Sequence, residues 1–101
     1  MKIVYLSGKI TGLSEAEYML YFKNAELKLK QMGYRVINPA RRGEIPGYKW
    51  EDYMKDCIKE LCGADLIYHL PNWQESEGAK MEHYIAAKLK IPELEMYGEK
   101  K

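Results

Sequence analysis

The sequence lacks any apolar run close to the roughly 20 residues that a membrane-spanning helix needs. It also lacks a hydrophobic signal-peptide core after Met1. Its two cysteines, Cys57 and Cys62, are too few for a disulfide framework or a four-cysteine metal site. From these absences we expect neither a membrane protein nor a disulfide-stapled secreted domain, but a cytoplasmic protein with both thiols reduced.

The chain also lacks an excess of charge of one sign. Sixteen basic residues stand against fifteen acidic ones, for a formal net charge of +1. A polyanion such as nucleic acid is therefore not an expected partner, because the chain carries no general field that would attract it.

Short apolar runs alternate with segments of helical periodicity. Strands are expected at residues 2–7, 34–38 and 64–70, with a further edge strand at 91–96 containing Pro92. Helices are expected from the Ser14–Glu17 capping box to Gly33, over residues 50–62, and over residues 77–89. This order predicts one α/β domain over residues 1–101, a Rossmann- or flavodoxin-like three-layer sandwich. Its mostly parallel sheet would have four to five strands in the order 2-1-3-4.

Glu82 is the most informative residue of the last expected helix. At helical spacing it shares a face with small and apolar residues: Gly78, Ala79, Ile85, Ala86 and Leu89. A carboxylate on an inward-facing stripe is costly to bury and tends to have a shifted pKa. Because Gly78 and Ala79 leave space beside it, and ligands of parallel sheets bind at the carboxyl ends of the strands, this segment is a candidate site.

Two other segments would lie at the same edge of the sheet. The loop from Ser7 to Gly12 has two glycines, Gly8 and Gly12, that let the backbone approach a ligand, although an ordinary strand-to-helix turn explains them equally well. Ser76 is a plausible N-cap, and the amides after it either hold an anion or only cap the helix.

Single residues elsewhere have both functional and structural interpretations. Asp52 and Asp56 lie four residues apart on the middle helix. Either one of them donates a proton to a leaving group, or both belong to a solvated polar face. His69 has no metal partner in the sequence pattern, so we expect no metal and no cofactor. Trp73 would stack on a planar base or form a subunit contact.

A set of motifs in order along nearly the whole chain resembles the nucleoside 2-deoxyribosyltransferase superfamily, and most closely its small DUF4406 branch. The matching segments are Tyr5-Leu-Ser-Gly-Lys-Ile-Thr-Gly12, Asn38-Pro39, Trp50-Glu-Asp-Tyr-Met54, Ala64-Asp-Leu-Ile67, Leu70-Pro-Asn-Trp73 and Ser76-x-Gly-Ala-x-x-Glu82.

The resemblance implies a covalent mechanism at an anomeric carbon. Glu82 matches the nucleophile that attacks C1′ of a 2′-deoxyriboside, and Tyr5 matches the tyrosine that orients it. The segment Gly8, Lys9, Ile10 and Gly12 matches the loop that walls the base and sugar pocket. Serine at position 76, where transferases tend to have aspartate, favours a 5′-monophosphate and hydrolysis, because a hydroxyl at a helix N-terminus accommodates a phosphate.

One position departs from the superfamily pattern. Cys57 stands where related enzymes carry the acid that helps to protonate the leaving base, and Asp56 is its neighbour about 100° round the helix. We therefore expect an N-glycosidase or deoxyribosyltransferase acting on a nucleoside or nucleotide as a homodimer or homotetramer, with Asp56 as the candidate acid. The alternatives are a non-catalytic nucleotide-binding module and an oligomeric scaffold.

Overall fold

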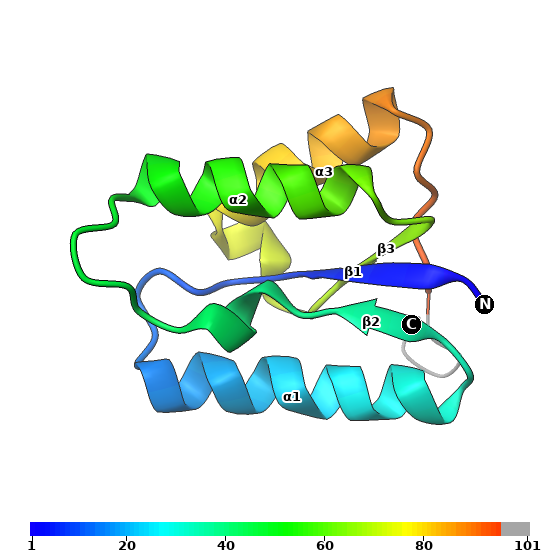
Figure 1. Ribbon diagram of the computed structural model, residues 1–101, viewed down its shortest axis with the longest axis horizontal. Helices are drawn as coiled ribbons and strands as arrows, with labels where there is room; N and C mark the ends of the chain where they lie inside the picture. Colours follow the sequence, from blue (N-terminus) through cyan, green and yellow to red (C-terminus); the bar gives the residue numbers. More distant parts are fainter. Residues whose placement is uncertain (96–101) are drawn as a thin grey trace.

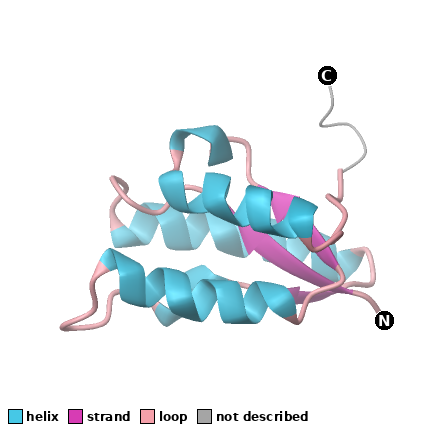
Figure 2. Ribbon diagram, turned by 90° about the horizontal axis from the view of Figure 1, so that it is seen from above, coloured by secondary structure: helices cyan, strands magenta, loops and turns pink. Residues whose placement is uncertain are grey.

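The computed structural model describes residues 1–95 and has three layers. Strands β1 (Ile3–Ser7), β2 (Arg35–Ile37) and β3 (Leu66–His69) form a parallel sheet in the order β2-β1-β3. Helix α1 (Glu15–Gln31) covers one face, and α2 (Trp50–Cys62) and α3 (Glu77–Lys88) cover the other (Figures 1 and 2). The predicted α/β class and the order of the first three strands are confirmed. Within residues 1–95, no helix has the length and apolar character needed to cross a membrane.

The predicted sheet of four to five strands is wrong, because the described chain has three. The segment expected as the last strand does lie beside β3, but it forms one isolated parallel bridge, between Glu93 and Ile67. Two backbone hydrogen bonds hold it: Ile67 N–H donates to the Pro92 carbonyl at 3.0 Å, and Leu94 N–H donates to the Ile67 carbonyl at 2.8 Å. Pro92 has no N–H of its own to extend this ladder, and Met96 lies outside the described residues.

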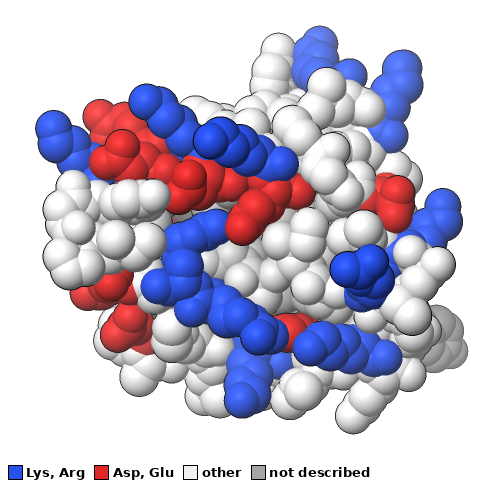
Figure 3. Space-filling model, viewed as in Figure 1, with Lys and Arg blue, Asp and Glu red and all other residues white. Residues whose placement is uncertain are grey.

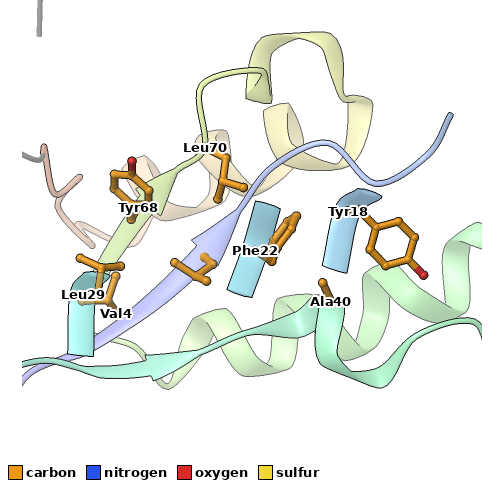
Figure 4. Packing of buried hydrophobic residues seen from close by; sticks show 8 residues of the cluster. Val4, Tyr18, Phe22, Leu29, Ala40, Tyr68 and Leu70 are labelled. Carbon is orange, nitrogen blue, oxygen red and sulfur yellow. The ribbon is translucent and has the colours of Figure 1, made fainter. Parts of the chain in front are cut away.

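Side chains of β1 alternate between two hydrophobic clusters. Val4 and Leu6 belong to the cluster that contains Phe22 and Leu29 of α1, and Figure 4 shows Val4 among the side chains of that cluster. Tyr5 points to the other face, where it packs with Cys57 and other residues of α2, β3 and α3. Because successive strand residues face opposite sides, Ser7 lies on the same face as Tyr5.

The helix ends follow the predicted signals. Ser14 and Glu17 form the capping box of α1, α2 spans the predicted residues 50–62, and Ser76 caps α3 by accepting a 3.0 Å hydrogen bond from Ala79 N–H. The cap at Ser76 fixes where α3 begins, and therefore where Glu82 sits relative to the sheet.

A buried carboxylate on α1 holds the segment that follows β2. Glu26 is 3% exposed and accepts hydrogen bonds from Asn38 at 2.9 Å and from Arg41, with an ion pair to Lys30 at 2.8 Å. Burial alone would raise the pKa of Glu26, but the hydrogen bonds from Asn38 and Lys30 and the charge of Arg41 hold it below its ordinary value. This cluster anchors the short 3₁₀ helix η1 (Pro39–Arg42), which leads into the candidate site.

Charges of both signs lie close together on the face that Figure 3 shows. This mixture agrees with the net charge of +1.

Candidate active site

A cavity of about 590 Å³ opens at the carboxyl end of β1, between the two helical layers. Its volume is within the range of small-molecule pockets, roughly 300–1,000 Å³. The lining comes from the end of β1 and the loop after it, the first half of α1, the segment from η1 to α2, one face of α2, and the first two turns of α3. The predicted site residues among the lining are Tyr5, Gly8, Ile10, Gly12, Ser76, Gly78 and Glu82.

Glu82 is held on both carboxylate oxygens by hydroxyl groups of β1. The Tyr5 hydroxyl donates to Oε2 at 2.7 Å, and the Ser7 hydroxyl donates to Oε1 at 2.7 Å. All three residues are buried, with Glu82 5% exposed, and Tyr5 and Glu82 line the cavity. The carboxylate is thus fixed in orientation by two groups from a rigid central strand.

The Glu82 carboxylate has no cationic partner among the residues that the structure describes. Burial therefore raises the pKa of Glu82 above its ordinary value, while the hydrogen bonds from Ser7 and Tyr5 offset part of that rise. Burial and the charge of Glu82 raise the pKa of Tyr5 well above 10, so the phenol remains a hydrogen-bond donor. The result is a desolvated, oriented oxygen nucleophile or hydrogen-bond acceptor facing a cavity.

Gly78 and Ala79 at the start of α3 lie in the cavity lining together with Glu82. A Cβ on Gly78 would approach Met54 Sδ to 2.9 Å, so α2 and α3 come together closely here because the side chain is absent. Ser76 lines the cavity, but its hydroxyl already accepts a hydrogen bond from Ala79 N–H.

Aromatic residues of the segment before α2 and of its first turn form one wall of the cavity. Tyr48 and Tyr53 meet edge to face with ring centroids 4.9 Å apart, and Trp50 lies in the same lining. Such a wall suits a planar ligand, because aromatic rings stack on π faces.

Arg42 is the only lysine or arginine in the described lining of this cavity. Its guanidinium forms an ion pair with Glu60 at 2.7 Å and donates to the Pro39 carbonyl at 3.1 Å. It also lies 3.5 Å from Cys57 Sγ, a thiol whose pKa burial raises. Arg42 is thus largely engaged with the protein.

Three predicted site residues are not part of the cavity lining. Asp56 accepts a 2.8 Å hydrogen bond from the Tyr48 hydroxyl, so it reaches the cavity only through that ring. Lys9 pairs with Glu75 at 3.1 Å. Trp73 lies on η2 (Trp73–Glu75) and stacks on His69 with centroids 4.3 Å apart. Burial, and then His83, lower the pKa of His69 to about 4.

The sequence interpretation missed Ser7 as a partner of Glu82. Strand alternation carried the signal, since Ser7 is two residues after Tyr5 and faces the same side of the sheet. It also assigned no role to Tyr48, which lies in a loop whose path depends on the contacts of η1.

The comparisons with known proteins identify the family. Residues 2–94 match the family model described as "Domain of unknown function (DUF4406)". The chain belongs to the DUF4406 family, as the sequence resemblance indicated. No curated protein and no solved structure matches the chain.

Proposed function

We propose that this protein cleaves or transfers the N-glycosidic bond of 2′-deoxynucleosides or their 5′-monophosphates, with Glu82 as the nucleophile. The observation that carries the proposal is the buried, unpaired Glu82 carboxylate, held at 2.7 Å by both Tyr5 and Ser7 beside a cavity of about 590 Å³. A carboxylate kept without a counter-charge costs folding energy, and such groups cluster at functional sites. The resemblance to nucleoside 2-deoxyribosyltransferases supplies the reaction type.

The proposed reaction has two displacements at C1′. In the first, one oxygen of Glu82 forms a bond to C1′ while the bond from C1′ to the base nitrogen breaks, and the base leaves with the electron pair and takes up a proton. In the second, water or another base bonds to C1′ and releases Glu82 as a carboxylate; the attacking group gives up its proton to solvent. The Tyr5 and Ser7 hydroxyls orient Glu82 and stabilise its charge before attack and after release.

The proton for the leaving base would come from the aromatic wall. Asp56 accepts a hydrogen bond from the Tyr48 hydroxyl and does not line the cavity, so in a relay Tyr48 would give its proton to the leaving base and take one from protonated Asp56. Two described cations in or beside the cavity lining are already paired, Lys9 with Glu75 and Arg42 with Glu60. This favours the nucleoside over the 5′-monophosphate for the isolated chain.

A panel assay tests the proposal. The protein is incubated with deoxynucleosides, ribonucleosides and their 5′-monophosphates, with and without an acceptor base, and released base is measured by chromatography. We expect release with a 2′-deoxy substrate and its loss in Glu82→Gln. The exposed Glu77→Gln on the same helix is the matched control. Absence of release from every substrate would refute the catalytic proposal.

The second candidate is a non-catalytic nucleotide-binding module. The thiol of Cys57 at the position of the expected acid, together with Asp56 outside the lining, favours it. It predicts saturable binding of an intact nucleoside or nucleotide, measured calorimetrically, with no release of base. Binding that Glu82→Gln weakens would assign Glu82 to the sugar hydroxyls.

We also propose a homodimer or homotetramer in which a neighbouring subunit completes the cavity. The exposed side chains of Met81, Tyr84 and Leu89 on and after α3 are compatible with a subunit contact. Light scattering after size-exclusion chromatography measures the mass directly, and a monomer across the micromolar range would refute this part.

A further inference from the structure

The two histidines of the chain come together between β3 and α3, outside the cavity lining. The sequence holds two histidines, His69 at the end of β3 and His83 on α3. Nε2 of His69 lies 3.0 Å from Nδ1 of His83, so these two nitrogens point toward each other. Neither residue lines the cavity that contains Glu82.

A carboxylate completes the group. His69, His83 and Glu93 can each offer one ligand atom, and these three atoms lie within 4.8 Å of one another. Glu93 is fixed at its backbone, because its neighbours Pro92 and Leu94 are hydrogen-bonded to Ile67 of β3, and its side chain is exposed. The group is thus reachable from solvent at one side and enclosed at the other, where His69 is 6% exposed.

The indole of Trp73 holds both imidazoles in place. Its ring centroid is 4.3 Å from that of His69 and 4.6 Å from that of His83, with interplanar angles of 22° and 32°. Imidazoles packed against an indole, one stacked and one tilted, lose little further freedom when they bind a ligand, which is the preorganisation that a metal site needs.

We propose that His69, His83 and Glu93 form a binding site for a divalent first-row transition metal ion of the zinc type, separate from the Glu82 cavity. Two imidazole nitrogens and one carboxylate oxygen are a donor set that zinc uses, with a fourth position left to water. Two zinc–nitrogen bonds of about 2.0–2.1 Å at a tetrahedral angle separate the nitrogens by about 3.3 Å, close to the 3.0 Å between these rings.

The same geometry limits the strength of the site. Both facing nitrogens must present lone pairs to the metal, so each neutral ring must carry its hydrogen on the outer nitrogen. For His69 this outer atom is Nδ1, which is buried without a hydrogen-bond partner in the described chain. Loss of such an outer partner weakens metal binding roughly 10–100-fold, so we expect a site weaker than one with a complete outer shell.

Calorimetric titration of the untagged protein with zinc chloride tests the proposal. We expect one equivalent of Zn²⁺ to bind. His83→Gln should abolish zinc binding, and Glu93→Gln should weaken it about tenfold or more. The control is Glu77→Gln, which removes a carboxylate from the helix that carries His83 and should leave zinc binding unchanged. Because His83 is half-buried and Glu93 is exposed, both variants should fold, and their far-ultraviolet circular dichroism is compared with wild type.

Tryptophan fluorescence gives an independent signal. In a Trp50→Phe background, Trp73 is the one remaining tryptophan and lies against both histidines. Bound Cu²⁺ should quench its emission with the same stoichiometry as zinc binding. Absence of zinc binding, or binding that persists unchanged in both His83→Gln and Glu93→Gln, would overturn the proposal.

Discussion

The hydrogen bond between Tyr5 and Glu82 should contribute measurably to stability as well as to the site. Tyr5→Phe removes one hydroxyl and keeps the buried ring, so packing in the α2–α3 layer is retained. The lost bond is 2.7 Å long, buried, and ends on a carboxylate that has no cation partner in residues 1–95. Hydrogen bonds to charged groups contribute about 1.5–3 kcal/mol, so we expect a loss of about 2 kcal/mol.

Urea unfolding followed by circular dichroism measures this loss. For a slope between about 1 and 3 kcal/mol/M, a change of about 2 kcal/mol moves the midpoint by roughly 1 M. The melting temperature should fall by about 8–16 °C, since 1 kcal/mol corresponds to about 4–8 °C in a domain of this size. The matched control is Tyr21→Phe, where the side chain is 45% exposed and we expect a change within about 0.5 kcal/mol.

A double-mutant cycle assigns the loss to the pair. If Tyr5 acts through Glu82, Tyr5→Phe should cost less in a Glu82→Gln background than in the wild-type protein, giving a coupling energy of at least about 1 kcal/mol. If Tyr5→Phe and Tyr21→Phe are equally stable, or if the coupling energy with Glu82→Gln is zero, the Tyr5 hydroxyl does not stabilise a charged Glu82 carboxylate, and the prediction is refuted.

Three further predictions concern the rest of the fold. Gly8→Ala should destabilise the protein by about 1–3 kcal/mol in urea unfolding, because the new Cβ would lie 2.9 Å from Leu70 Cβ, which cannot turn away; an unchanged midpoint would contradict this packing. Lys90 has φ 61° after α3, so Lys90→Gly should raise stability by about 0.5–1 kcal/mol, and a lower melting temperature would show that the strain is absent. Glu26 has a lowered pKa in the folded protein, so its stabilisation is present above the carboxyl pKa of the unfolded chain and is lost as pH falls through the lower folded value. Glu26→Gln should accordingly be less stable than wild type at pH 7, and the gap should close in acid; a gap that widens in acid would contradict the sign.

The sequence was most informative where local patterns decide the structure. The helical stripe predicted that Glu82 faces inward beside Gly78 and Ala79, and the structure buries all three. The capping signals at Ser14 and Ser76 predicted where their helices begin. Each of these features depends on residues within one or two turns of one another.

The features that were missed depend on contacts between distant segments. The number of strands depended on whether residues 91–96 run far enough along β3, and one bridge at Glu93 does not make a strand. Their positions in the chain predicted that Asp56 and Trp73 lie at the cavity. In the structure the Asp56 side chain contacts Tyr48, and the Trp73 ring packs on His69 and His83. Loop conformation and side-chain partners of this kind carry no periodic signal.

The position of β1 in the middle of the sheet has a consequence for how the protein folds. Tyr5 and Glu82 are 77 positions apart, so their hydrogen bond closes nearly the whole described chain into one loop. The entropy cost of closure grows with loop length, and pairing of β1 with β2 closes a shorter loop than pairing with β3. We therefore expect the carboxylate to meet its two hydroxyls after the folding barrier, so that substitutions there accelerate unfolding and leave the refolding rate nearly unchanged.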